Sequence, residues 1–297
     1  MKLKKTIFNA LLFFQAALVV TGGAVRLTGS GLGCPTWPTC TGSSISPVPH
    51  QAQGALHSWI EFGNRLLTVA LVIASVVALV ATVKWSKNRI DRRRVRWIAI
   101  WQLLGIFGQA ILGGITVLTK LNPIPVSGHF LVSIVLIGGG LSLRHRMLDR
   151  PRVKALPVTW KMVRVVTALA ALVVGVGTLV TGSGPHAGDI QAKRYPFAPR
   201  EISYLHADLV IALICLAIGL LLIIRVSETG ESKARLTRAL EIFLITSLAQ
   251  GFIGYVQYFT GLPESLVALH LLGATTVWIA AWNIYLIAKP TQHTQRK

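Results

Sequence analysis

Eight long apolar runs constrain this chain more than any other feature of its sequence. Each is about 20 residues long, the length of helix that crosses roughly 30 Å of hydrocarbon. The runs cover residues 7–25, 58–83, 97–118, 126–143, 162–181, 204–224, 239–259 and 266–288. A segment surrounded by lipid must satisfy its own backbone hydrogen bonds, and an α-helix does this. The sequence therefore predicts an all-α integral membrane protein with eight transmembrane helices.

The charged residues support this class and predict an orientation. Only 13% of the residues are charged, whereas a soluble domain carries about 25%. Of the 30 Lys and Arg residues, 24 lie at one set of helix ends, in residues 2–5, 84–96, 144–164, 225–238 and 289–297. The positive-inside rule then predicts that both termini are cytoplasmic, in a bacterial cell membrane.

The net charge of +20 could also suggest nucleic-acid binding. The basic loops are short and directly flank the predicted helices, so we expect membrane lipid and no nucleic acid as their partner. The first run follows basic residues, as a signal peptide does. It is too long for a typical signal core and ends without a clear cleavage site, so we expect a retained helix.

The two halves of the chain repeat each other. Gln109, Gly113 and His129 in the first half correspond to Gln250, Gly254 and His270 in the second, each 141 positions later. Residues 28–31 and 181–184 are both Thr-Gly-Ser-Gly. Because the repeat unit has an even number of helices, the halves have the same orientation in the membrane. We predict two tandem pseudosymmetric four-helix bundles, residues 1–150 and 151–297.

Four histidines lie near the outer ends of the even-numbered runs. A single histidine in a helix is more often a packing residue than a ligand, but His206 and His270 share one depth on neighbouring helices. Two neutral imidazoles so placed suit the axial positions of a haem, and without Cys-x-x-Cys-His the haem would be held non-covalently. In the first half, His129 has no histidine partner: Asn64 stands at the position equivalent to His206, and His57 lies about 10 Å further out.

An acid, a base and two cysteines complete the candidate site. Glu61 and Arg65 share one helix face. They form either a structural ion pair, or a reactive carboxylate with Arg65 holding an anion such as a haem propionate. Cys34 and Cys40 lie in the first outer loop, in a compartment that permits disulfides. The prolines between them stiffen the loop, and we expect a disulfide.

With these residues the chain resembles the haem A synthase family. The motifs that carry the resemblance are the segment from Thr28 to Cys40, Ile60-Glu-Phe-Gly-Asn-Arg65, the two Gln-x-x-x-Gly segments and the histidines. Members of this family oxidise a methyl group of haem O to the formyl group of haem A, for aa3-type terminal oxidases. The resemblance implies a haem b held by His206 and His270, and a haem O substrate near His129 and Glu61. It also maps the family's outer-loop cysteine pair onto Cys34 and Cys40.

One departure from the family pattern concerns the substrate haem. The family pattern is Glu-x-x-His-Arg, and this chain has Asn64 at the histidine position. Asn64 could ligate weakly, His57 could substitute, or the iron could be five-coordinate through His129. We expect Glu61 to be the catalytic carboxylate.

Two other functions fit parts of the pattern. A membrane dihaem cytochrome would use the same histidines for electron transfer and would not need Glu61. A transporter would explain the repeat, but it would more typically have broken helices and polar clusters at mid-membrane. The haems of the purified protein separate the three functions. Expected partners are haem O, an electron donor that the sequence does not identify, and the farnesyltransferase that makes haem O.

Overall fold

The fold of this chain is a set of eight long helices. The computed structural model describes residues 2–189 and 192–290. Within them the helices are α1 Lys2–Leu27, α2 Ala55–Trp85, α3 Arg92–Leu118, α4 Pro123–Met147, α5 Pro157–Ser183, α6 Pro199–Ser227, α7 Gly230–Phe259 and α8 Glu264–Ala288. All eight are long and apolar enough to cross a membrane, and the described residues contain no strand. The prediction of eight helices is confirmed.

The helices extend beyond the apolar runs at most ends, because hydrocarbon thickness limits the apolar stretch and not the helix. Proline begins three of them: Pro123 in α4, Pro157 in α5 and Pro199 in α6. Proline suits this position because its missing N–H has no partner in the first turn of a helix. At α4, Asn122 caps the end by accepting a hydrogen bond from the Ile124 N–H.

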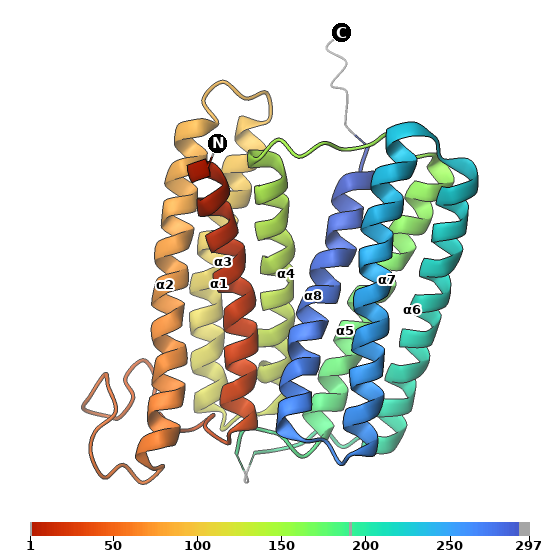
Figure 1. The fold of residues 1–297 in the computed structure, drawn as a ribbon. Helices are drawn as coiled ribbons and strands as arrows, with labels where there is room; N and C mark the ends of the chain where they lie inside the picture. Colours follow the sequence, from red (N-terminus) through yellow and green to blue (C-terminus); the bar gives the residue numbers. More distant parts are fainter. Residues whose placement is uncertain (1, 190–191, 291–297) are drawn as a thin grey trace.

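The helices of each half of the chain pack in the same cyclic order. In the first half α1 contacts α2 and α4, and α3 contacts α2 and α4. In the second half α5 contacts α6 and α8, and α7 contacts α6 and α8. Figure 1 shows the two groups side by side, with α1–α4 on the left and α5–α8 on the right.

Helix α8 forms most of the contact between the two groups, packing against α1 and α4. The Trp278 indole donates to the Ile134 carbonyl at 2.8 Å, and Trp282 donates to the Ser142 hydroxyl at 2.9 Å. Glycine permits the approach at Gly138, where a Cβ would lie 3.3 Å from the Trp282 ring. Both tryptophan N–H groups therefore have a hydrogen-bond acceptor at the interface between α1–α4 and α5–α8, which we call the seam.

The two ends of the molecule differ. At the basic end lie the first residues of α1 and the connections 86–91, 148–156 and 228–229. At the disulfide end lie residues 28–54, 119–122, 184–189, 192–198 and 260–263 (Figure 1). The largest buried apolar clusters, around Phe8, Leu143, Leu220 and Phe243, fill the half of each group near the basic end. The half near the disulfide end is therefore free to hold a cavity.

Candidate functional site

One cavity runs through the half of the molecule near the disulfide end. Its volume is about 640 Å³ and residues of all eight helices line it, which is within the usual size of a ligand pocket. The predicted site residues that line it are Glu61, Asn64, Arg65, His129, His206 and His270. Residues from α2, α4, α6 and α8 thus share one space.

Three histidines on even-numbered helices each pack against a glycine on the preceding helix. A Cβ on that glycine would lie within 3.1–3.4 Å of the imidazole Cε1. The pairs are Gly113 with His129, Gly177 with His206, and Gly254 with His270. At Gly177 and Gly254 an added Cβ would displace the imidazole by a few tenths of an ångström, whereas at Gly113 it would make an ordinary contact.

The imidazoles line the cavity and carry nitrogen atoms that the described residues leave unpartnered. The Nδ1 atoms of His129, His206 and His270 are buried without a hydrogen-bond partner. Two glutamines brace the histidine backbones: Gln109 donates to the His129 carbonyl at 2.8 Å, and Gln250 donates to the His270 carbonyl at 2.6 Å. Rings held against a cavity in this way fit a haem with axial imidazole ligands.

The two candidates for the remaining ligand position lie in different surroundings. Asn64 lines the cavity, and its Oδ1 accepts a hydrogen bond from the Thr21 hydroxyl at 2.7 Å. His57 is not among the residues that line the cavity. Its Nδ1 lies 3.0 Å from the Ser30 hydroxyl, beneath the loop that follows α1. Of the two, Asn64 alone faces the cavity.

Glu61 is buried, with 6% of its surface exposed, and both carboxylate oxygens are engaged. Oε2 accepts from the backbone N–H of Cys34 at 2.7 Å, and Oε1 accepts from Arg65 Nη2 at 2.6 Å and Nε at 3.1 Å. These donors offset part of the cost of burying the charge. The carboxylate is thereby held in one orientation at the edge of the cavity.

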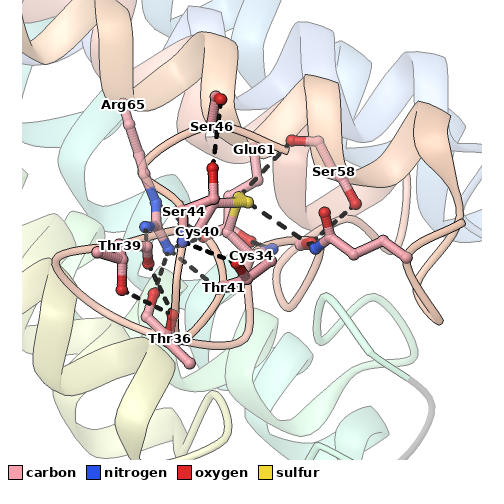
Figure 2. The surroundings of a disulfide bond; sticks show 12 residues. Cys34, Thr36, Thr39, Cys40, Thr41, Ser44, Ser46, Ser58, Glu61 and Arg65 are labelled. Atoms are coloured by element: carbon pink, nitrogen blue, oxygen red, sulfur yellow. Dashed lines mark hydrogen bonds and ion pairs between the residues drawn. A yellow bond between two sulfur atoms is a disulfide. The ribbon is translucent and has the colours of Figure 1, made fainter. Parts of the chain in front are cut away.

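Arg65 connects α2 to the loop between α1 and α2. Besides Glu61, its guanidinium donates to the carbonyls of Cys34, Thr36, Pro38 and Thr39. Figure 2 shows the Arg65 side chain reaching from the helix into this loop. The prediction that Arg65 contacts a haem propionate stays a prediction, and it would require the guanidinium to release at least one of these carbonyls.

The loop itself is closed by the predicted disulfide. Cys34 and Cys40 are bonded, with their Cα atoms 4.3 Å apart, so this prediction is confirmed. Between them, Trp37 packs on α3 at Gly114, where a Cβ would lie 2.6 Å from the indole. Trp37 and Pro38 both line the cavity. The disulfide-closed segment therefore forms part of the cavity wall.

Several residues of the site were missed by the sequence analysis. Arg26 lines the cavity and donates to the His186 carbonyl and, at 2.8 Å, to the Thr181 carbonyl, so it joins α1 to the second half. Gln15 also lines the cavity and donates to Gln102 at 2.5 Å. The sequence feature that could have identified Gln15 is a polar residue inside an apolar run. Thr21 and Asn64 have the same feature.

Comparisons with known proteins identify the family of this chain. The family model of the COX15-CtaA cytochrome oxidase assembly proteins matches residues 5–191. Heme A synthase of Geobacillus thermodenitrificans is 30% identical over 112 residues, which are 38% of this chain and 32% of that protein. The same enzyme of Lysinibacillus sphaericus is 32% identical over 132 residues, 43% of this chain and 40% of that protein.

Heme A synthase of Bacillus pumilus is 30% identical over 154 residues. That match covers 51% of this chain and 48% of the relative. The chain thus spans between about a third and a half of the length of these curated relatives.

Proposed function

The chain belongs to the COX15-CtaA family of cytochrome oxidase assembly proteins, and we propose that it is a haem A synthase. In this proposal it oxidises a methyl group of haem O to the formyl group of haem A. The observation that carries the proposal is the single cavity onto which Glu61 and the three histidines converge. Relatives that match parts of the chain carry the name heme A synthase.

The proposal divides the chain into two tandem bundles with different tasks. Residues 151–297, the last seven of which lie outside the described residues, form the bundle that holds haem b through His206 and His270. Residues 1–150 form the bundle that holds haem O through His129. Both termini face the cytoplasm of a bacterium, and the cavity lies toward the outer side of the membrane. The excess of basic residues at the basic end supports this orientation.

The resident haem supplies electron transfer when it is bound. The chain's own residues supply position and charge. Glycines 113, 177 and 254 let the helices approach closely enough to set the histidines at the cavity wall, and the two glutamines brace the helix pairs. Trp37 and Pro38 cover the cavity, which excludes water from the substrate.

Glu61 is the catalytic carboxylate in this proposal. Converting a methyl to a formyl group takes two successive oxidations, through an alcohol and then a hydrated aldehyde that loses water. In this proposal each oxidation would consume O2, two protons and two electrons from the electron donor, place one oxygen atom on the carbon and release the other as water. Each oxidation leaves the carbon electron-poor, and a fixed carboxylate stabilises that charge without reorganising. Oε2 keeps a lone pair beside its bond to Cys34, so it can also take a proton as the substrate loses one.

Replacing Glu61 with glutamine tests the catalytic role. Glu61→Gln keeps the shape of the side chain and removes its charge, so we expect haem b to stay bound, haem O to accumulate and haem A to disappear. Liquid chromatography of haems extracted from the purified protein measures all three. Glu241→Gln, at an exposed ion pair near the basic end, is the matched control. Haem A formation by Glu61→Gln at near the parent rate would leave Glu61 with a structural role only.

The same chromatography separates the alternatives. A dihaem cytochrome carries haem b alone and a transporter carries no pigment, whereas a synthase from cells that make haem O also contains haem O or haem A. The electron donor is a further partner in the proposal, as is the farnesyltransferase that makes haem O.

A further inference from the structure

Asn64 occupies the fourth of four corresponding positions around the cavity. Three of these are the histidines that pack on a glycine of the preceding helix. At the fourth, a Cβ on Gly22 of α1 would lie 3.9 Å from Asn64 Nδ2 on α2. The contact between α1 and α2 thus has the same form as the other three, with a carboxamide in place of the imidazole. Asn64 stands where a second axial ligand of the N-terminal haem would be expected.

His57 does not take the imidazole's place. His57, the residue that could substitute by sequence, is directed to Ser30 at 3.0 Å and does not line the cavity. Its backbone is also covered by the loop, since a Cβ on Gly33 would collide with the His57 carbonyl. A shift of His57 into the cavity would require this loop to move.

The carboxamide of Asn64 is a poorer iron ligand than an imidazole, because its oxygen already accepts a hydrogen bond. Its Oδ1, the atom with lone pairs, accepts the hydrogen bond from Thr21 at 2.7 Å. The atom toward Gly22 is Nδ2, and an amide nitrogen is a donor with no lone pair to give. Asparagine is also shorter than histidine, so space remains between it and an iron held by His129.

We propose that Asn64 keeps the second axial position of the N-terminal haem open, and that its Nδ2 donates a hydrogen bond to a small molecule bound there. This inference rests on the proposed function, because it takes the N-terminal haem as the substrate. The two haems then differ in accessibility. His206 and His270 close both faces of the C-terminal haem, while the N-terminal haem accepts a diatomic ligand or water. Distal donors and access are the features that set whether a haem binds small ligands or only transfers electrons.

Carbon monoxide is the probe for the open position. The purified holoprotein, from cells that make haem O, is reduced with dithionite and exposed to carbon monoxide. We expect one of the two haems to bind it, while the low-spin spectrum of the other is unchanged. Asn64→His should fit, since glycine faces this position as it faces the three histidines. It should abolish carbon monoxide binding and convert the N-terminal haem to the low-spin form.

A second variant tests the hydrogen bond. Asn64→Leu removes the donor and keeps the position open, so carbon monoxide should still bind and its infrared stretching frequency should rise. Thr21→Val should move that frequency too, because Thr21 sets the orientation of the carboxamide. An unchanged frequency in Asn64→Leu would overturn the donor role. A parent protein whose two haems are both low-spin and unreactive toward carbon monoxide would overturn the open position.

The proposed function can fail separately. Carbon monoxide binding to the N-terminal haem without any haem A formation would refute the reaction and leave the inference standing. Haem A formation by a protein whose N-terminal haem is low-spin would support the reaction and overturn the inference. A protein that holds only the haem of His206 and His270 would overturn both.

Discussion

Arg65 illustrates how a charged residue is accommodated near the membrane. Its side chain is 20% exposed, and it forms an ion pair with Glu61 at 2.6 Å. The remaining N–H groups reach carbonyls of the loop between Cys34 and Cys40 (Figure 2). A planar guanidinium can serve this many acceptors at once, whereas an ammonium cannot. Arg65 therefore positions both the carboxylate and the loop.

Replacing Arg65 with lysine should destabilise this corner of the protein. Lysine keeps the charge but has three donors, so several loop carbonyls lose their partner. We expect a loss of about 2 kcal/mol in the free energy of unfolding, since hydrogen bonds to charged groups contribute roughly 1.5–3 kcal/mol each. Denaturation of the purified protein in detergent measures this. Arg200→Lys, at an exposed arginine paired with Tyr204, should be close to the parent, and equal stability of both variants would refute the positioning role.

The residues of the site were predictable to different degrees. Glu61 was found because a charged residue inside an apolar run is costly unless it is paired or functional. His129 and Asn64 were found because they stand at the positions that correspond to His270 and His206 in the repeat. The acceptors of Arg65 were not, because backbone carbonyls exist at every residue and leave no pattern in the sequence. The orientation of His57 toward Ser30 was equally hidden, since helical spacing places a residue on a face but does not show what covers it.

Each pair of consecutive helices, odd with even, is held together around a glycine. Gly254 on α7 faces His270 on α8, and Gln250 one turn earlier braces the His270 backbone. The contact matters because it sets the depth of the imidazole in the cavity. The repeat in the sequence reflects this element-level unit, and this explains why glutamine, glycine and histidine recur together.

Adding a methyl group at Gly254 should disturb the proposed haem b site. In Gly254→Ala the new Cβ would lie 3.1 Å from His270 Cε1, so the imidazole must move. We expect reduced haem b content and a changed low-spin spectrum. Gly219→Ala on α6 is the matched control, because nothing lies within 4 Å of its Cβ. Alanine there should stabilise its helix by up to about 1 kcal/mol. An unaltered spectrum in Gly254→Ala would show that the contact is not needed.

The helices themselves were predicted from the apolar runs, but their ends were not. The fourth run was expected at 126–143, and α4 covers Pro123–Met147. Its added residues include Arg144 and His145, which continue the helix beyond the apolar stretch. Hydropathy indicates where a helix meets lipid, whereas capping by Asn122 and Pro123 decides where it starts.

At the scale of the whole molecule, charge is concentrated at the basic end and is partly neutralised there. Asp91, between α2 and α3, accepts from Arg89 at 2.9 Å and from Arg146 of α4 at 3.0 Å. Burial alone would raise the pKa of Asp91. The hydrogen bonds and charges of the two arginines outweigh this and hold the pKa below its ordinary value of 3.8. Asp91 thus joins three helices of the first bundle.

Asp91→Asn should lower stability by roughly 0.5–1 kcal/mol, the usual range for a partly exposed ion pair. Because the folded pKa is depressed, the stabilisation is fully present above the unfolded pKa and is lost as the pH falls through the folded value. The difference between parent and variant should therefore stay constant from about pH 7 to 5 and shrink below about pH 4. Unfolding at several pH values measures it. Glu231→Gln, at an exposed helical pair with Arg235, should have a smaller effect, and a difference that grows in acid would contradict the assignment.

The helices α1–α4 and α5–α8 line one cavity, so its shape depends on the contacts that α8 makes with α1 and α4. Trp278 is 5% exposed and its indole N–H bonds the Ile134 carbonyl at 2.8 Å. Trp278→Phe keeps an aromatic ring and removes this bond, which should cost about 0.6–1 kcal/mol in the free energy of unfolding. Because the seam positions α8, the spectrum of the haem on His270 should broaden as well. Trp97→Phe, on a ring that is 49% exposed, should change neither stability nor spectrum. If Trp278→Phe behaves like this control, contacts other than the tryptophan hydrogen bond hold the bundles together.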